Sequence, residues 1–473
     1  MMSLLLAVAL SIWVIRNYVR YPAFFLVALF LTWQFALKVF ATVFLDLLGP
    51  VYSDEVYTEV GGFGASAPLM VLFIAIPLGA LWKAMTDFRH PLRLIKEPYL
   101  AQGGFTQADL ICWLVSALLC CLYVDMIRLG QIPLLSGLER FEYQGGLFHN
   151  YTLNFLFLIS LAMGYAITRT RLLTGRWDMR FGLLLLLLFF YLLLTGHRFG
   201  AFFVTVSFVM LPLAAFFIAP QVGMSVATPV MKRGLLQRVI RSRFALVAFS
   251  FSLLGIVLLA MAHSLLNVRD GDPAEALLQR LLVQPAHLYW LTWERWHTGQ
   301  MQDMGDALDF VFHHPFDPSR NTGIQYLMFL HLGHDTASRV YENQQVDYAG
   351  GYPEILMEVG GVGLGLFAAL IASTVTAWLY RIHVLAVCRG HPLTALMSVY
   401  VALGIIYFFL GGMLNFVAAQ SYWLKIGLLL FVVLLERGSE RSGRRLIPWI
   451  LVPRPHAAST TPPASMPPSG KKS

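Results

Sequence analysis

The sequence predicts an all-α integral membrane protein with about eleven transmembrane helices. Of its 473 residues, 58% are hydrophobic and only 13% are charged, whereas soluble domains carry roughly 25% charged residues. The mean hydropathy is +0.66. Apolar runs that approach the length needed to cross a bilayer, ~20 residues, cover most of the chain and leave one long polar segment, residues 262–352.

The expected spans follow one another through short connections. They are residues 1–15, 22–48, 65–82, 108–123, 151–168, 181–195, 201–220, 244–264, 353–380, 393–410 and 422–435. The first run has no leading Lys or Arg, which favours a retained span over a cleaved signal peptide. We expect one polytopic domain, residues 1–452, followed by a Pro/Ser/Thr/Ala-rich disordered cytoplasmic tail, residues 453–473.

The distribution of basic residues predicts the orientation in the membrane. Twenty-four of the 34 Lys and Arg residues fall in one alternate set of connections and in the C-terminal segment. The positive-inside rule makes that set cytoplasmic, so the segment 262–352 and the N-terminus face away from the cytoplasm. The net charge of +8 therefore reflects topology, and no nucleic-acid, Walker A or dinucleotide motif accompanies it. The four cysteines fit neither a disulfide framework nor a metal site.

Two short outward connections carry charge. In the tight turn 195–200, Arg198 either extends to the lipid headgroups or holds a phosphate. The run 131–140 is an extended apolar stretch that ends in Glu139 and Arg140. It forms either a structural cover or a wall that binds a lipid-linked substrate.

The long outward loop begins with a Trp-rich stretch, residues 273–296, which predicts one interfacial helix. Arg280 and Gln284 lie four positions apart and would share a face of that helix, either solvated or on an anionic glycolipid. The loop's histidines (His313, His314, His331 and His334) lack the usual metal-site spacing, so no metal site is predicted.

Charged residues inside or beside the spans are the strongest anomalies. Lys38 lies within a predicted span and is expected to pair with an acid such as Asp125 or Glu358, or to serve a proton or ion path. Glu354 and Glu358 lie four apart at the outer end of another span. One of them could act as a general base, although pairing with an outward Arg is the safer expectation.

All outward basic residues are arginines, which favours phosphate recognition. They are Arg128, Arg140, Arg198, Arg269, Arg280, Arg295, Arg320 and Arg339.

These features together resemble the O-antigen polymerase (Wzy) family of oligosaccharide repeat-unit polymerases. The carriers are GQIPLLSG at 130–137, LLLTGHRFGAFF at 192–203, Arg280 with Gln284 early in the large outer loop, and YPEILMEVGGVGLG at 352–365. Some members carry an Arg followed eleven positions later by Gly in their outer loops, and Arg339 with Gly350 fits that spacing.

The resemblance implies a GT-C-like membrane fold and a metal-independent glycosyltransferase without a cofactor. Such an enzyme would polymerise undecaprenyl-pyrophosphate-linked repeat units at the outer face of the inner membrane. Its partners would be that lipid-linked glycan, membrane lipid, a chain-length regulator and a flippase. The implied catalytic residues are Arg198, Arg280, Arg339 and Glu354, and the implied substrate-binding residues are Arg140, Glu139, Gln284, Arg320, Asp347 and Tyr352. Arginine suits this chemistry because a pyrophosphate leaving group needs its developing charge stabilised.

Three alternatives stay open at the sequence level. An O-antigen ligase-like transferase would use the same donor with another acceptor. A polysaccharide or lipid transporter would show repeat symmetry and broken helices; no symmetry is visible, but Lys38 is compatible with transport. A membrane assembly subunit would use the outer loop only to dock partners.

Overall fold

The computed structural model describes residues 2–62, 64–87, 107–130, 132–133, 143, 145–197, 199–222, 275, 278–301, 305, 307–308, 323–333, 335–337, 350–414, 417, 419–441, 444–447 and 450–453. Its principal elements are α1 (Met2–Arg20), α2 (Pro22–Leu48), β1 (Val51–Ser53), β2 (Thr58–Val60), α3 (Ala67–Thr86), α4 (Gln107–Leu129), α6 (Leu147–Asn154), α7 (Leu156–Thr174), α8 (Met179–Leu194), α9 (Phe199–Met210), η1 (Leu211–Leu213), α10 (Ala214–Ile218), η2 (Ala219–Val222), η3 (Gln279–Val283), α14 (His287–His297), α16 (Gly323–Leu332), α18 (Glu354–Arg389), α19 (Pro392–Gly411), α21 (Gln420–Arg441), β3 (Arg444–Ile447) and β4 (Ile450–Pro453).

The described chain is mostly helical and membrane-embedded. Eight of its helices are long and apolar enough to cross a membrane. Two further expected spans correspond to α8, an apolar helix of 16 residues, and to α21, while the expected span 244–264 lies outside the described residues. Helices suit this environment because they satisfy every backbone hydrogen bond within one segment. The only strands among the described residues form two short antiparallel hairpins, β1–β2 and β3–β4.

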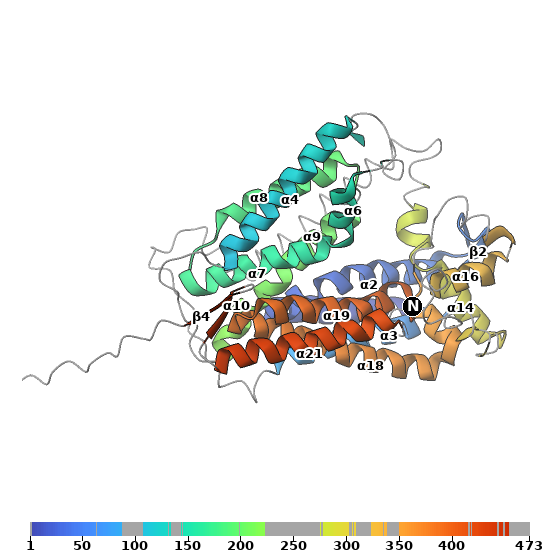
Figure 1. The fold of residues 1–473 in the computed structure, drawn as a ribbon. Coiled ribbons are helices and arrows are strands. Elements are labelled where there is room, and N and C mark those ends of the chain that lie inside the picture. Colours follow the sequence, from blue (N-terminus) through green and yellow to red (C-terminus); the bar gives the residue numbers. More distant parts are fainter. Residues whose placement is uncertain are drawn as a thin grey trace, which may run out of the picture.

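The helices pack into two groups (Figure 1). The larger group is built on α2, α3, α18 and α19, with α1 and α21 beside them. The smaller group has its own core between α4, α7, α8 and α9. Helix α7 packs against both α9 and α19, so it joins the two groups.

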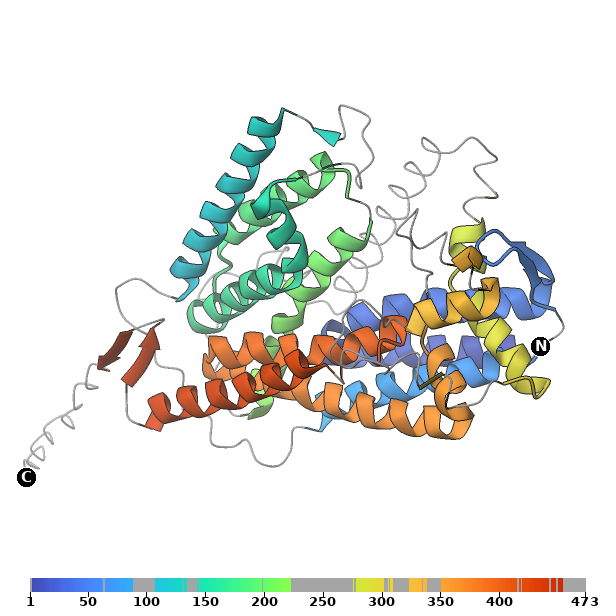
Figure 2. The ribbon, with the colours of Figure 1, turned by 45° about the vertical axis from the view of Figure 1, so that its right-hand side comes forward.

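Different elements gather at the two ends of the larger group (Figures 1 and 2). One end holds the β1–β2 hairpin, which connects α2 to α3, together with η3, α14, α16 and the start of α18. It is called the hairpin end below, after β1–β2. The opposite end gathers basic residues of the set expected to be cytoplasmic. There Arg169 of α7 donates to the carbonyl oxygens of Val387 (3.2 Å) and Cys388 (2.8 Å) in the last turn of α18. A cation at this position stabilises a helix C-terminus.

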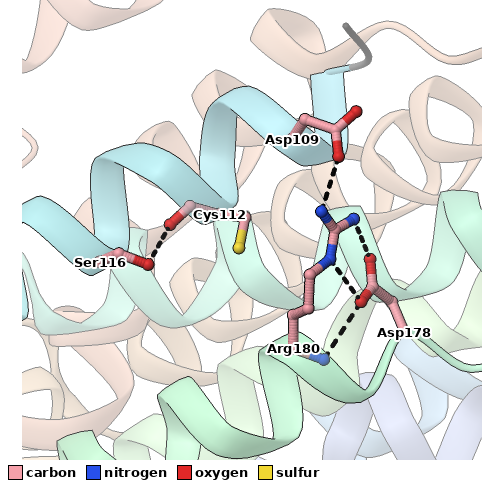
Figure 3. A network of polar contacts seen from close by, with 5 residues as sticks. All are labelled: Asp109, Cys112, Ser116, Asp178 and Arg180. Carbon is pink, nitrogen blue, oxygen red and sulfur yellow. Dashed lines mark hydrogen bonds and ion pairs between the residues drawn. The ribbon is translucent and has the colours of Figure 1, made fainter.

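A charged clamp holds the first turns of α4 and α8 together (Figure 3). Asp178 caps α8 by accepting from the backbone N–H of Arg180 at 3.1 Å. The Arg180 guanidinium contacts Asp178 at 2.7 Å and Asp109 of α4 at 2.8 Å. These hydrogen bonds hold the pKa of Asp178 below its usual range. The Arg180 side chain is 53% exposed, so solvent screens the clamp.

Candidate functional site

The hairpin end is assembled by hydrogen bonds between distant parts of the chain. Tyr289 of α14 donates to the carbonyl oxygen of Ser66 at 2.7 Å. Gln279 of η3 donates to the carbonyl oxygen of Tyr52 in β1 at 2.6 Å. Both donors come from the long polar segment, so its described first part packs onto the ends of the apolar helices.

A buried ion pair lies at the centre of this end. The ammonium of Lys38, in α2, contacts a carboxylate oxygen of Glu354, the first residue of α18. It also donates to the carbonyl oxygen of Tyr352. The side chains of Lys38 and Glu354 are 9% and 0% exposed. The sequence correctly predicted a partner within the bundle but named the wrong acid, because spacing along the chain does not show which helix packs beside α2.

Four glycines, two before α18 and two at the end of α19, let these two chain segments pack closely beside the ion pair. A Cβ atom on Gly351 would lie 2.2 Å from the carbonyl oxygen of Gly411, so the chain entering α18 touches the end of α19 backbone to backbone. Gly412 makes the reciprocal approach to Gly351. A Cβ on Gly350 would lie 3.4 Å from the Glu354 carboxylate and 3.6 Å from the Lys38 ammonium. Gly350 therefore covers the ion pair with backbone alone.

Tyr352 belongs to the core of this end. Its side chain is buried against the rings of Phe408 and Phe409. Its hydroxyl donates to the carbonyl oxygen of Phe73 at 2.8 Å. The residue therefore fixes the entry into α18 through both its carbonyl and its hydroxyl group.

A second buried carboxylate joins the loop to α18. Arg295 of α14 contacts Glu358 at 3.3 Å, and the Glu358 side chain is 0% exposed. The expected pairing of one of the two glutamates with an arginine of the outer loop is therefore present. Helix α18 breaks soon afterwards at Gly361, where φ is 65° and ψ is −179°, so the segment carrying both glutamates is set off from the long remainder of the helix.

Two neutral histidines lie near these charges. His287, the first residue of α14, is buried and lies 3.3 Å from the Ser53 hydroxyl and 3.5 Å from a Glu55 carboxylate oxygen. Burial lowers its pKa to about 3, helped by His331 and Lys38. Burial likewise lowers the pKa of His331, on α16, to about 4, helped by Arg295. Because both imidazoles are neutral at pH 7, the His287–Glu55 contact is polar but not an ion pair.

The expected single helix over residues 273–296 is wrong. The described chain forms a π-helical turn, η3, then a break, and a new helix from His287. Pro285 explains the break, because proline lacks an N–H and clashes with the preceding turn. Arg280 is half-buried on η3, which packs against α2 and β1, and Gln284 ends that turn.

The smaller helix group carries a second polar cluster that sequence reasoning missed. His149 of α6 lies 2.9 Å from the Tyr191 hydroxyl, and its ring contacts those of Tyr143 and His197. Burial lowers the pKa of His149, while the charge of Asp125 opposes that shift. One buried Asp125 oxygen makes no hydrogen bond within the described chain. His197 lies in the predicted turn 195–200, so the turn was a usable signal, but nothing in the spacing linked it to α6.

The remaining site residues predicted from the sequence lie outside the described residues. They are Arg140, Glu139, Arg198, Arg320, Arg339 and Asp347. The structure thus brings Glu354, Tyr352, Arg280 and Gln284 to the hairpin end. Within the part of the chain that is described, no three His, Cys, Asp or Glu side chains form a group suited to a metal ion.

Fold and site together define a polytopic helical membrane protein with a buried charged centre at one end. Comparison with known proteins adds one match. The model of a family of unknown function, DUF6418, matches residues 317–424. That range includes the Gly350–Gly351 approach, both buried glutamates and all of α18 and α19. No curated protein and no solved structure matches the chain.

Proposed function

We propose that this protein polymerises undecaprenyl-pyrophosphate-linked oligosaccharide repeat units into a surface polysaccharide. In this proposal the hairpin end faces outward from the inner membrane and the helices form a GT-C-like arrangement. The observation that carries it is the buried Lys38–Glu354 pair beneath Gly350. Ionisable groups inside a membrane are costly, and by default they indicate function.

The chemistry is a displacement at the anomeric carbon of the growing glycan. The acceptor hydroxyl of the incoming repeat unit forms the new glycosidic bond, and the bond to undecaprenyl pyrophosphate breaks. The acceptor proton passes to a carboxylate, and the lipid pyrophosphate leaves with the bonding electrons. Lys38, Arg280 and Arg295 supply positive charge at the hairpin end, where a pyrophosphate needs it.

Glu354 has two roles in this proposal. In the described conformation it neutralises Lys38. A pyrophosphate that approached the ammonium would compete with Glu354, and the released carboxylate would then be free to accept the acceptor proton. Asp347 and Glu139 stay alternative bases.

Transport of a lipid-linked glycan is the second candidate. The break in α18 at Gly361, just after two buried glutamates, is the observation that favours it, since transporters build substrate sites from discontinuous helices. A ligase-like transferase shares the donor and differs only in its acceptor.

Deleting the gene in its own host and displaying surface glycans on gels separates these functions. The polymerase proposal expects single-repeat products in place of long ladders. Normal ladders that are not attached to the lipid A-core acceptor would instead indicate a ligase, and substrate retained inside the cell would indicate a transporter.

A residue-level complementation test then locates the chemistry. Arg280→Ala should abolish long ladders while the protein stays at wild-type level in the membrane, and Glu354→Gln, which leaves the Lys38 ammonium buried without its partner, should abolish them per molecule of protein that remains in the membrane. Arg180→Gln is the matched control, because it removes a charge from the opposite end of the molecule. Wild-type chain lengths in both hairpin-end variants would rule out the proposed site.

A further inference from the structure

A cavity separates the two helix groups at α19 and α21. Its volume is about 150 Å³, and its lining includes Asn154, Phe157, Tyr400, Ser421 and Lys425. Asn154 and Phe157 come from the α6–α7 junction and Tyr400 from α19. Ser421 and Lys425 come from the start of α21. This cavity is separate from the Lys38–Glu354 pair and plays no part in the proposed glycan transfer.

Lys425 is the unusual residue in this cavity. It is half-buried in an otherwise apolar stretch of α21. Its ammonium lies 4.4 Å from the centre of the Tyr400 ring, and no described carboxylate forms an ion pair with it. Tyr400 in turn stacks on Phe157 at 5.9 Å. A cation–π contact holds the charge in place but leaves its hydrogen-bond donors available for a ligand.

The charge of Lys425 lies close to the start of α21. Lys425 lies five residues after the start of the helix at Gln420, which is about 8 Å along the axis at 1.5 Å per residue. Ser421, one turn earlier, adds a hydroxyl, and the N-terminus of a helix favours negative charge. The lining of the cavity continues from Lys425 back to Ser421, so the cavity reaches from the start of α21 to the ammonium.

The surface beside the cavity is apolar and exposed. Leu428, three positions after Lys425 and on the same side of α21, is 47% exposed. Ser421, Lys425 and Leu428 follow one another at helical spacing on one side of α21. A ligand with a negative head and a hydrocarbon chain would therefore meet the ammonium first and then the exposed side chain of Leu428.

We propose that this cavity binds the phosphate headgroup of an anionic lipid, with Lys425 as the phosphate contact and Tyr400 as its support. Lysine binds phosphate as a point charge. The competing explanation is a lysine that merely extends to the membrane surface. The two explanations make different predictions, because only a binding site would prefer an anionic phospholipid over a zwitterionic one with the same acyl chains.

The test uses the purified full-length protein in detergent, probed by native mass spectrometry with phosphatidylglycerol or phosphatidylcholine of identical chains. The wild-type protein should retain phosphatidylglycerol preferentially. Lys425→Gln should lower its retention at least fivefold, and Lys425→Arg should keep most of it. Lys83→Gln, which removes an exposed charge at the other end of the larger group, should have no effect. Equal retention by Lys425→Gln and Lys83→Gln would overturn the proposal.

Labelling of the unmodified protein provides an independent readout that needs no folded variant. Phosphatidylglycerol, but not phosphatidylcholine, should protect Lys425 from an amine-reactive reagent in lipid vesicles. Protection by sn-glycerol 3-phosphate as well would mean that the site takes the phosphate group without its chain. If neither phosphatidylglycerol nor sn-glycerol 3-phosphate protected Lys425, the result would contradict the proposed site.

Discussion

The Lys38–Glu354 pair and the Arg180–Asp109 pair join the same kinds of charge at opposite ends of the molecule, in opposite environments. The first pair is 9% and 0% exposed and the second is 53% and 27% exposed. Exposed pairs are worth about 0–1 kcal/mol. Burying two charges costs several kcal/mol each, so a buried pair is weak evidence for a stabilising role. Neither pair is therefore expected to add much net stability, and the function proposed above supplies a reason to keep the buried one.

Removing one partner of the buried pair should have the largest effect. Lys38→Ala leaves Glu354 charged in an apolar surrounding, which costs about 3–5 kcal/mol. Thermal unfolding in detergent should show a clear drop in the transition temperature, together with lower membrane levels. An unchanged transition would mean that Glu354 reaches water or another cation.

The glycine contact beside the pair should come next. Gly351 has a φ of 119°, and a Cβ there would meet the Gly411 carbonyl oxygen at 2.2 Å. Gly351→Ala should therefore destabilise the protein by about 1–3 kcal/mol. Gly427→Ala is the matched control, because nothing lies within 4 Å of its added Cβ. Equal unfolding temperatures for the two variants would refute the close approach.

Acid should weaken the hairpin end through its buried imidazoles. His287 has a folded-state pKa of about 3 against ~6.5 when unfolded. Between these values the unfolded state binds more protons, so stability is complete above pH ~6.5 and falls as the pH drops towards 3. The loss at pH 5 is about 2 kcal/mol for this residue. His287→Asn should reduce the slope of unfolding free energy against pH, whereas His297→Asn, at an exposed position, should leave it unchanged.

The clamp at the opposite end should give the smallest effect. Arg180→Gln should cost no more than about 1 kcal/mol, and added salt should shrink the difference from wild type. Unfolding measured at low and high ionic strength checks both points. A loss as large as that of Lys38→Ala would remove the contrast between the two ends.

The sequence predicted the helical membrane class because hydrophobic runs and charge bias are local signals. Charge in the spans also marked Lys38, Glu354 and Glu358 correctly as unusual. The identity of the Lys38 partner could not be predicted, because it depends on how α18 packs beside α2. The same holds for His149 and Tyr191, which lie 42 positions apart in the chain.

One local signal was available and was missed. Pro285 breaks the expected interfacial helix, and His287 then starts α14 with its side chain directed into the core. Because proline ends or kinks a helix, its position alone predicts that η3 and α14 are separate elements. By contrast, the need for glycine at 351 could not be predicted, because it depends on the packing of the end of α19 against this position.

The double variant Lys38→Met/Glu354→Gln tests the central claim most directly. It removes both charges together, so neither charge is left buried alone, and the cost of burying the amide of Glu354→Gln is smaller than that of an unpaired charge. We expect an unfolding temperature above that of Lys38→Ala, normal membrane levels and no long glycan ladder in the deleted host. A stable double variant that restores full-length ladders would show that the buried pair only supports the fold.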